Sequence, residues 1–135
     1  MGVIEDRHRA YADGVLASIG PGIDYLGPLE RPELSMLLHD ARALVMPLLW
    51  DEPFGLVVVE SLASGTPVVA WRRGAMAEII VDGETAVLVE GVDDAVEAVG
   101  VVSGLSREHC ADVARKQFSD VVMAEKYGRV YRSLA

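Results

Sequence analysis

The sequence predicts an α/β fold, with a Rossmann-like parallel sheet of about four strands and helices on both faces of the sheet. Short apolar segments alternate with segments whose apolar residues recur at helical spacing, which is the pattern of a parallel sheet covered on both sides. These strands are therefore expected to be buried on both faces. The expected strands are residues 23–26, 43–47, 68–71 and 86–89.

The first half of the chain supplies two helices and two strands. Residues 4–19 carry apolar positions at helical spacing and end at Gly-Pro-Gly, residues 20–22, which is a strong helix stop. The short apolar segment 23–26 then predicts a strand that runs into a loop. A second helix is expected over residues 32–41, where leucines recur at 3.6-residue spacing, and it leads into strand 43–47.

A helix is expected over residues 55–64, although its first part, Leu56-Val-Val-Val59, is rich in β-branched residues that favour a strand. The strand alternative fails on connectivity, because a single Gly-Thr-Pro turn cannot return the chain to a parallel neighbour. Strand 68–71 follows this turn. A short helix over 75–81 and a turn at Asp82-Gly-Glu-Thr85 then precede strand 86–89.

The remainder of the chain is expected to be helical. The three helices span residues 92–102, a segment that begins at the N-cap Ser106 and reaches about Lys116, and residues 121–134. The whole of 1–135 is thus predicted to be one domain, and a partial one. A complete doubly wound nucleotide-binding domain has about six strands and does not open on a helix, so further strands are expected upstream.

Composition excludes several classes of function. The net charge of −9 disfavours binding to nucleic acid or to anionic lipid, both of which need clustered Lys and Arg. The longest uncharged apolar stretch, residues 43–50, is far shorter than the roughly 20 residues of a membrane-spanning helix. A charged N-terminus without a signal sequence and a single cysteine, Cys110, indicate the cytoplasm. Cys110 is interpreted as a core residue, and the three histidines share no ligand spacing, so no metal is predicted.

The segment between strand 43–47 and the next helix is the candidate site. It lies at the C-terminal edge of the expected sheet, where ligands bind in open α/β folds. The free amides at the start of that helix, from Gly55 to Val57, form an anion site into which a phosphate fits. The alternative is that Pro53 and Gly55 only shape a turn and the amides bind water.

Glu60 is the second informative residue, because it stands in an otherwise apolar helix. A carboxylate in such company is rarely buried without a partner. It lies about one and a half turns into the helix, from where it reaches back toward the edge that Glu52 borders. Carboxylates of this kind accept hydrogen bonds from the vicinal hydroxyls of a ribose or a sugar. Exposure of Glu60 to solvent on an outer helix face is the equally weighted alternative.

The order of these motifs resembles the C-terminal, donor-binding domain of the family 4 retaining glycosyltransferases, which have two facing Rossmann-like domains (the GT-B fold). The segment from Glu52 to Glu60 is similar to the Glu-x7-Glu motif of that family. The residues that follow the motif, through Ala70, resemble its helix and strand. Arg73-Gly74 to Ile80 is similar to its glycine-rich turn, and Asp82 to Thr85 to its Asp-Gly-x-Thr turn. The similarity extends over about residues 23–135.

The resemblance implies a role for each matched residue. Glu52, at the catalytic position, would contact the hydroxyls of the donor sugar, while the amides of Phe54, Gly55 and Leu56 would hold the diphosphate or sugar. Glu60 would bind the ribose, and Gly74 would lie at the donor cleft, with Glu78 a weaker candidate. Arg72 and Arg73 would either line the acceptor-facing rim or be solvated charges.

The activity that the resemblance implies is hexosyl transfer with retention from a UDP-, GDP- or ADP-linked sugar, without a metal or another cofactor. The sequence departs from the family at Ala77, which replaces a proline, and at Ala86, which replaces a glycine. The Arg and Lys that meet the diphosphate in the family have no counterpart, and no acceptor domain is present. The isolated chain is therefore expected to be inactive, and to expose a sheet edge through which it forms a homodimer or remains marginally stable.

Two other functions stay open. One is a non-catalytic nucleotide-sugar-binding or interaction module, which gene context would distinguish, because an adjoining frame that encodes the missing domain would favour the enzyme. The other is a sugar-nucleotide epimerase on the same architecture. The Glu52 to Glu60 motif disfavours the epimerase.

Overall fold

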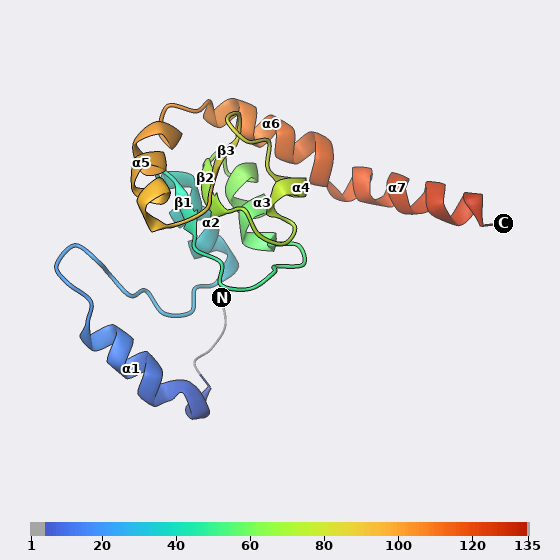
Figure 1. The fold of residues 1–135 in the computed structure, drawn as a ribbon. Coiled ribbons are helices and arrows are strands. Elements are labelled where there is room, and N and C mark those ends of the chain that lie inside the picture. The colour runs from blue at the N-terminus through green and yellow to red at the C-terminus, as the bar shows by residue number, and fades with distance from the viewer. Residues whose placement is uncertain (1–4, 135) are drawn as a thin grey trace. The chain divides into compact units, whose positions relative to one another are not determined.

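The computed structural model of the chain describes residues 5–134, in which helices alternate with three parallel strands (Figure 1). The chain divides after Leu34 into two compact units. The first unit holds a short 3-10 helix, Asp6–His8, and α1, Arg9–Ala17. Helix α2, Arg31–Asp40, crosses the division. Ile4, the expected start of the first helix, lies outside the described residues.

The second unit contains the sheet and its helices, in the order β1, α3, β2, α4, β3, α5, α6 and α7. The strands are β1 (Leu44–Met46), β2 (Val68–Trp71) and β3 (Ala86–Val89). The helices are α3 (Leu56–Ala63), α4 (Met76–Ile79), α5 (Val92–Val102), α6 (Arg107–Phe118) and α7 (Asp120–Ser133).

The three strands form a parallel sheet in the order β1-β2-β3, which confirms the α/β class. Leu44 pairs with Val68, and Val68 pairs with Ala86, so the first residues of the three strands are in register and the strands run in one direction. Each parallel crossover passes through a helix, which is the usual connection between parallel strands. The segment Leu56–Val59 is helical, as its connectivity predicts, in spite of its β-branched residues.

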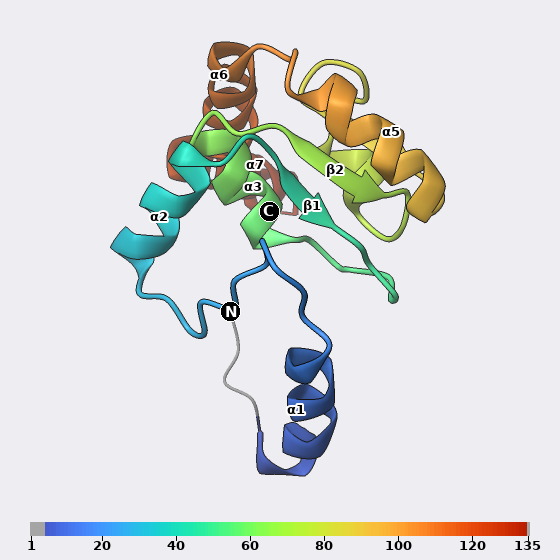
Figure 2. The ribbon, with the colours of Figure 1, turned by 90° about the vertical axis from the view of Figure 1, so that its left-hand side faces the viewer.

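The core lies on both faces of β2, because successive side chains of a strand point to opposite faces. Val68 and Ala70 join a cluster on the side of α3 and α6, with Leu62 of α3. Val69 joins the cluster on the side of α5. Figures 1 and 2 show α5 on one side of the sheet and α3 on the other. The predicted burial on both faces is therefore confirmed for β2.

Strand β1 differs from its prediction, because it is not buried on both faces. Val45 is 44% exposed. It faces the same side as its partner Val69, but α5 packs on β2 and β3 and does not cover it. Within residues 5–134, β1 has a neighbouring strand on one side only, so it is the edge of the sheet.

The predicted strand at 23–26 is wrong, and the sheet has three strands where about four were expected. Ile23, Tyr25 and Leu26 are each more than half exposed and take part in no strand. A strand requires a neighbour that accepts and donates its backbone hydrogen bonds, and no described residue supplies one. An apolar segment of this length therefore cannot form a strand by itself.

Helices α6 and α7 both begin at a serine N-cap, of which the sequence predicted the first. The Ser106 hydroxyl accepts a hydrogen bond from the His109 amide, which confirms this residue as the N-cap of α6. Helix α7 begins one residue earlier than expected, because Ser119 caps it through the Val122 amide. It has no buried residue and projects from the sheet (Figure 1). Among the described residues, no helix combines the length and apolar character needed to span a bilayer.

Candidate functional site

The candidate site is built from two loops at the C-terminal edge of the sheet. The first follows β1 and runs to Gly55, and the second follows β2 and runs to Ala75. Parallel strands bring both loops to the same edge. The Ala75 amide donates to the backbone carbonyl of Glu52 at 2.9 Å. Nη1 of Arg73 donates to the Leu49 carbonyl, also at 2.9 Å. These two bonds join the loops.

The carboxylate of Glu52 is held by one hydrogen bond on each of its oxygens. The Gly55 amide donates to Oε1 at 3.2 Å. The indole Nε1 of Trp50 donates to Oε2 at 3.0 Å. Glu52 itself is half-buried, so the carboxylate remains in reach of a ligand. The sequence did not indicate Trp50, because an indole two residues away meets the carboxylate only when the loop folds back on itself.

Gly55 is the N-cap of α3 and adopts φ +81°, in the left-handed region that favours glycine. A Cβ at this position would lie 2.6 Å from Cε of Met76, the end of a flexible side chain, so the left-handed φ is the main reason for glycine here. Its amide donates to Glu52. The next two amides, those of Leu56 and Val57, have no acceptor among residues 5–134. They are the free donors at the start of this helix.

Phe54 connects the same loop to α6. Its ring packs edge-on against that of Phe118, at the end of α6, with ring centroids 6.1 Å apart. An edge-to-face pair of aromatic rings contributes more stabilisation than the buried area of the two rings alone. The structure therefore gives the Phe54 side chain a packing role. The predicted binding role of its amide stays a prediction.

The structure places Glu60 in α3, half-buried, with no hydrogen bond or ion pair to its carboxylate from residues 5–134. The predicted alternative, in which Glu60 points to solvent on an outer helix face, also stays a prediction. Glu78 is exposed in the first turn of α4. No contact joins the side chains of Glu60 and Glu52. Their shared use of one ligand stays a prediction.

Gly74 contributes to the site through its backbone. It adopts φ +57°, and a Cβ there would lie 2.5 Å from both the amide nitrogen and the carbonyl oxygen of Glu52. Only glycine therefore allows the second loop to approach the first so closely. The sequence placed Gly74 near the donor cleft, and the structure brings it against Glu52.

The two arginines of the second loop are both paired. Arg72 contacts Asp82 at 2.7 Å and Glu90 at 3.2 Å. Arg73 lies 4.0 Å from Asp51, in addition to its bond to Leu49. Sequence reasoning missed these pairs, because they join loops that are distant along the chain. Both guanidinium groups are about half exposed, so their charges are shared between carboxylates and water.

Asp82 anchors the turn that precedes β3. The Leu88 amide donates to its Oδ1 at 2.9 Å, and this bond, followed by that from Arg72, lowers the pKa of the Asp82 carboxyl. Both bonds stabilise the ionised form. The turn predicted at Asp82 to Thr85 is thus held by its first residue.

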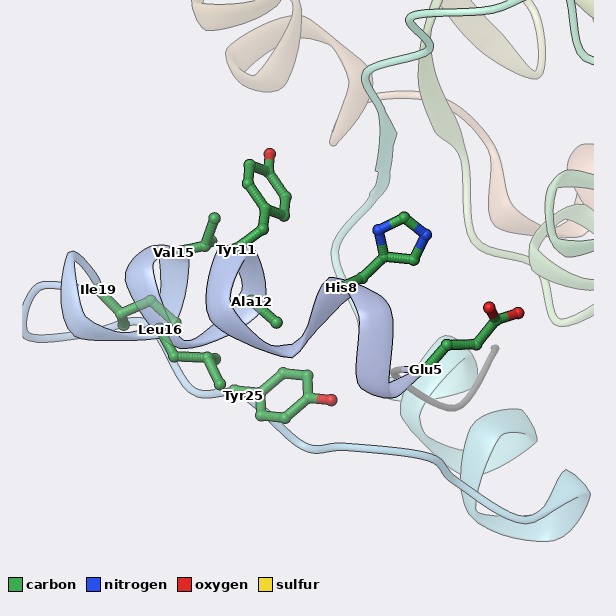
Figure 3. Close-up of a pocket in the computed structure, with 8 residues that line it drawn as sticks. All are labelled: Glu5, His8, Tyr11, Ala12, Val15, Leu16, Ile19 and Tyr25. Carbon is green, nitrogen blue, oxygen red and sulfur yellow. The ribbon is translucent and has the colours of Figure 1, made fainter.

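The other candidate residues lie away from this edge or are buried. Cys110 is fully buried in the core, which confirms its interpretation, and burial raises the pKa of its thiol. His109 contacts Glu84 at 3.0 Å on the surface. A separate cavity of about 580 Å³ lies within the first unit, along α1 (Figure 3). Its walls are mostly apolar and include Tyr11, Leu16 and Tyr25.

The sequence is similar to parts of known glycosyltransferases. The chain is similar to a D-inositol 3-phosphate glycosyltransferase of Arthrobacter sp. (strain FB24), with 47% identity over 64 residues, which are 47% of this chain and 15% of that protein. It is also similar to a glycogen synthase of Mycobacterium tuberculosis, with 44% identity over 63 residues, 47% of this chain and 15% of that protein. The chain thus matches a small part of the length of these relatives.

The fold is found in a solved structure as well. Sucrose-phosphate synthase from Thermosynechococcus elongatus superposes with a TM-score of 0.80 at 24% identity, over 98% of this chain and 37% of that chain. This similarity confirms the predicted GT-B type of α/β fold. A family model described as "Glycosyl transferases group 1" matches residues 3–104. Because this match spans most of the sequence, the chain belongs to the group 1 glycosyl transferases.

Proposed function

We propose that this chain is the donor-binding part of a retaining glycosyltransferase that takes its sugar from a nucleotide diphosphate sugar. The arrangement around Glu52 carries the proposal. Its carboxylate stands at the start of α3, between the Trp50 indole and the Gly55 amide. The amides of Leu56 and Val57, which have no acceptor within residues 5–134, follow directly. An acceptor of sugar hydroxyls and donors to phosphate therefore lie side by side.

The chemistry assigned to these groups is electrostatic and positional. The free amides, with the positive end of the α3 dipole, stabilise the departing diphosphate as its charge develops. Glu52 accepts hydrogen bonds from the hydroxyls of the sugar and holds its ring in place. The negative charge of Glu52, next to the sugar, also stabilises the positive, oxocarbenium-like charge that the sugar acquires. Glu52 is the catalytic residue of the proposal, and no metal or other cofactor takes part.

Glu60 is assigned to the ribose. It is half-buried in an otherwise apolar helix and has no partner for its carboxylate among residues 5–134. A half-buried carboxylate without a partner gains most from a ligand that donates hydrogen bonds. The two hydroxyls of a ribose are such donors. The nucleotide base is left open between uracil, guanine and adenine.

We propose that the acceptor is bound by a second domain of the group 1 glycosyl transferases that this chain does not span. The chain alone is then expected to bind the donor and not to transfer the sugar. Arg72 and Arg73, on the second loop, are proposed to face that acceptor domain. Within the cell, the cytoplasm is the proposed location, since nucleotide sugars are its substrates.

A non-catalytic nucleotide-sugar-binding module is the second candidate. The pairing of Arg72 and Arg73 favours it, because each guanidinium shares its charge with a carboxylate and neutralises a diphosphate less completely. Charge-assisted bonds are the strong ones, so a donor without them binds weakly and its diphosphate leaves less readily. Joining the chain to the matching acceptor domain and measuring sugar transfer separates the two. Transfer supports the enzyme, and donor binding without transfer supports the module.

The proposal is tested by isothermal titration of the chain with UDP, GDP and ADP and with their glucose conjugates. Glu60→Ala removes the proposed ribose contact. Glu125→Ala, an exposed glutamate of α7 without a hydrogen-bond partner among the described residues, is the matched control. Saturable binding of one nucleotide that is lost in Glu60→Ala and kept in Glu125→Ala would support the donor site. Absence of binding at millimolar concentrations would contradict it.

A further inference from the structure

We propose that Trp50 is a positioning residue that holds the carboxylate of Glu52 in place for the sugar of the donor. This inference rests on the proposed function and goes beyond it. Nε1 of Trp50 donates to Oε2 of Glu52 at 3.0 Å. A hydrogen bond to an ionised acceptor is about twice as strong as a neutral one.

Packing does not explain where Trp50 lies. The residue is 59% exposed, and it belongs to neither of the two core clusters. An indole left largely in water gains little from burial. Its one polar atom, however, meets the carboxylate that the proposed function needs. The bond to Glu52 is therefore the contact that gives this exposed aromatic its place.

The rest of Glu52 is already fixed. Its carbonyl accepts from the Ala75 amide at 2.9 Å, and Gly74 packs against its backbone. Freedom therefore remains only in the side chain, whose carboxylate is held at Oε1 by the Gly55 amide. With Trp50 on Oε2, each oxygen carries one donor. A carboxylate offers about four acceptor positions, so positions remain open on both oxygens for two sugar hydroxyls.

This arrangement predicts a selective effect. Trp50→Phe keeps an aromatic ring and removes the N–H donor, so the Glu52 carboxylate is held only at Oε1, by the Gly55 amide. The affinity for the nucleotide diphosphate glucose is expected to fall roughly fivefold to tenfold, the scale of one typical hydrogen bond made in contact with water. The affinity for the nucleotide diphosphate alone is expected to stay unchanged, because that ligand lacks the sugar that Glu52 contacts.

The hydrogen bond can be observed without any ligand. The chain contains two tryptophans, Trp50 and Trp71, so a ¹H–¹⁵N spectrum contains two indole resonances. Trp50→Phe and Trp71→Phe assign them by deletion. In Glu52→Ala the resonance of Trp50 is expected to move upfield, toward that of an indole in water, while the resonance of Trp71 keeps its position.

Isothermal titration then tests the role. Trp71→Phe is the matched control, because it makes the same change at a tryptophan of β2 whose N–H has no partner among residues 5–134. We expect Trp50→Phe to lose affinity for the glucose conjugate alone, and Trp71→Phe to bind both ligands as the unmodified chain does. Circular dichroism is used to verify that each variant is folded at the temperature of the titration.

Each outcome decides a separate point. An unmoved Trp50 resonance in Glu52→Ala would overturn the inference, whatever the ligands do. A moved resonance with unchanged affinity for the glucose conjugate in Trp50→Phe would also overturn it, since the bond would then have no positioning role. If the unmodified chain binds neither ligand, the proposed function fails and the role of Trp50 fails with it. The spectrum still shows in that case whether Trp50 and Glu52 are hydrogen-bonded.

Discussion

Gly74 lies so close to Glu52 that a methyl group on it would be 2.5 Å from both the amide nitrogen and the carbonyl oxygen of the glutamate. Two loops that follow different strands are thereby locked together at the C-terminal edge of the sheet. The hydrogen bond from the Ala75 amide to the Glu52 carbonyl closes the same contact. The position of the candidate catalytic Glu52 thus depends on Gly74, which lies 22 residues further along the chain (74 − 52 = 22).

Gly74→Ala is expected to destabilise the protein and to weaken donor binding. A non-glycine residue in the left-handed region costs about 1–2 kcal/mol, and here the clash with Glu52 adds to that cost. Gly83→Ala is the control, because Gly83 has φ +81° with no atom near its added Cβ. Urea denaturation should show a larger loss for Gly74→Ala, and titration should show weaker binding in that variant alone. Equal losses in the two variants would contradict the contact.

Thr66→Val is expected to lower the free energy of unfolding by about 1–3 kcal/mol. The Thr66 hydroxyl is fully buried, donates to the Leu38 carbonyl and accepts from Nη2 of Arg107 at 2.9 Å. Valine has the same shape and leaves both partners without that bond. Ser103→Ala, which removes an exposed hydroxyl bonded to the Gly100 carbonyl, should change stability by less than about 0.5 kcal/mol. Similar values for the two variants, measured in urea, would show that the buried network contributes little.

Asp82→Asn should lower stability near neutral pH and have a smaller effect in acid. The pKa of Asp82 is lowered in the folded protein, first by the Leu88 amide and then by Arg72. A lowered folded pKa stabilises the protein above the unfolded value of about 3.9 and loses that contribution as the pH falls through the folded pKa. Denaturation at a series of pH values, with Asp24→Asn as an exposed control, checks this. A difference that does not shrink in acid would refute the linkage.

Cys110 should make the protein less stable in alkaline solution. Burial raises the pKa of its thiol, so the unfolded chain loses the proton first. The contribution to stability is therefore complete below the unfolded pKa of about 8.5 and is lost as the pH rises through the folded pKa. Cys110→Ala should flatten the fall in stability above that pH, measured by urea denaturation. An unchanged slope in the variant would assign the fall to other groups.

The elements whose existence depends on local pattern and connectivity could be predicted from the sequence. The Ser106 cap of α6 and the helix at Leu56–Val59 are examples, since a hydroxyl at an N-cap and the length of a crossover are both visible along the chain. Local pattern could not decide whether residues 23–26 form a strand. The apolar residues of this segment fit a strand, but only a neighbouring strand decides whether the segment becomes one.

Some features of the candidate site could likewise be predicted from the sequence, and others could not. The positions of Glu52, Gly55 and Glu60 around the start of a helix follow from their spacing in the sequence. The bond from Trp50 to Glu52 and the pair of Arg72 with Asp82 do not, because each depends on side-chain directions and on loops that meet in space. No periodicity or composition encodes such contacts.

The α/β class, the parallel connectivity and the edge of the sheet that carries the candidate site could all be predicted from the sequence. These features depend on hydrophobic period, caps and crossover length, which are local properties of the chain. The folded structure was needed to show that Gly74 packs against Glu52, that Trp50 donates to its carboxylate and that β1 is the edge strand within residues 5–134. These features depend on how closely distant segments approach, and close packing sets that distance to within a fraction of an atom's diameter.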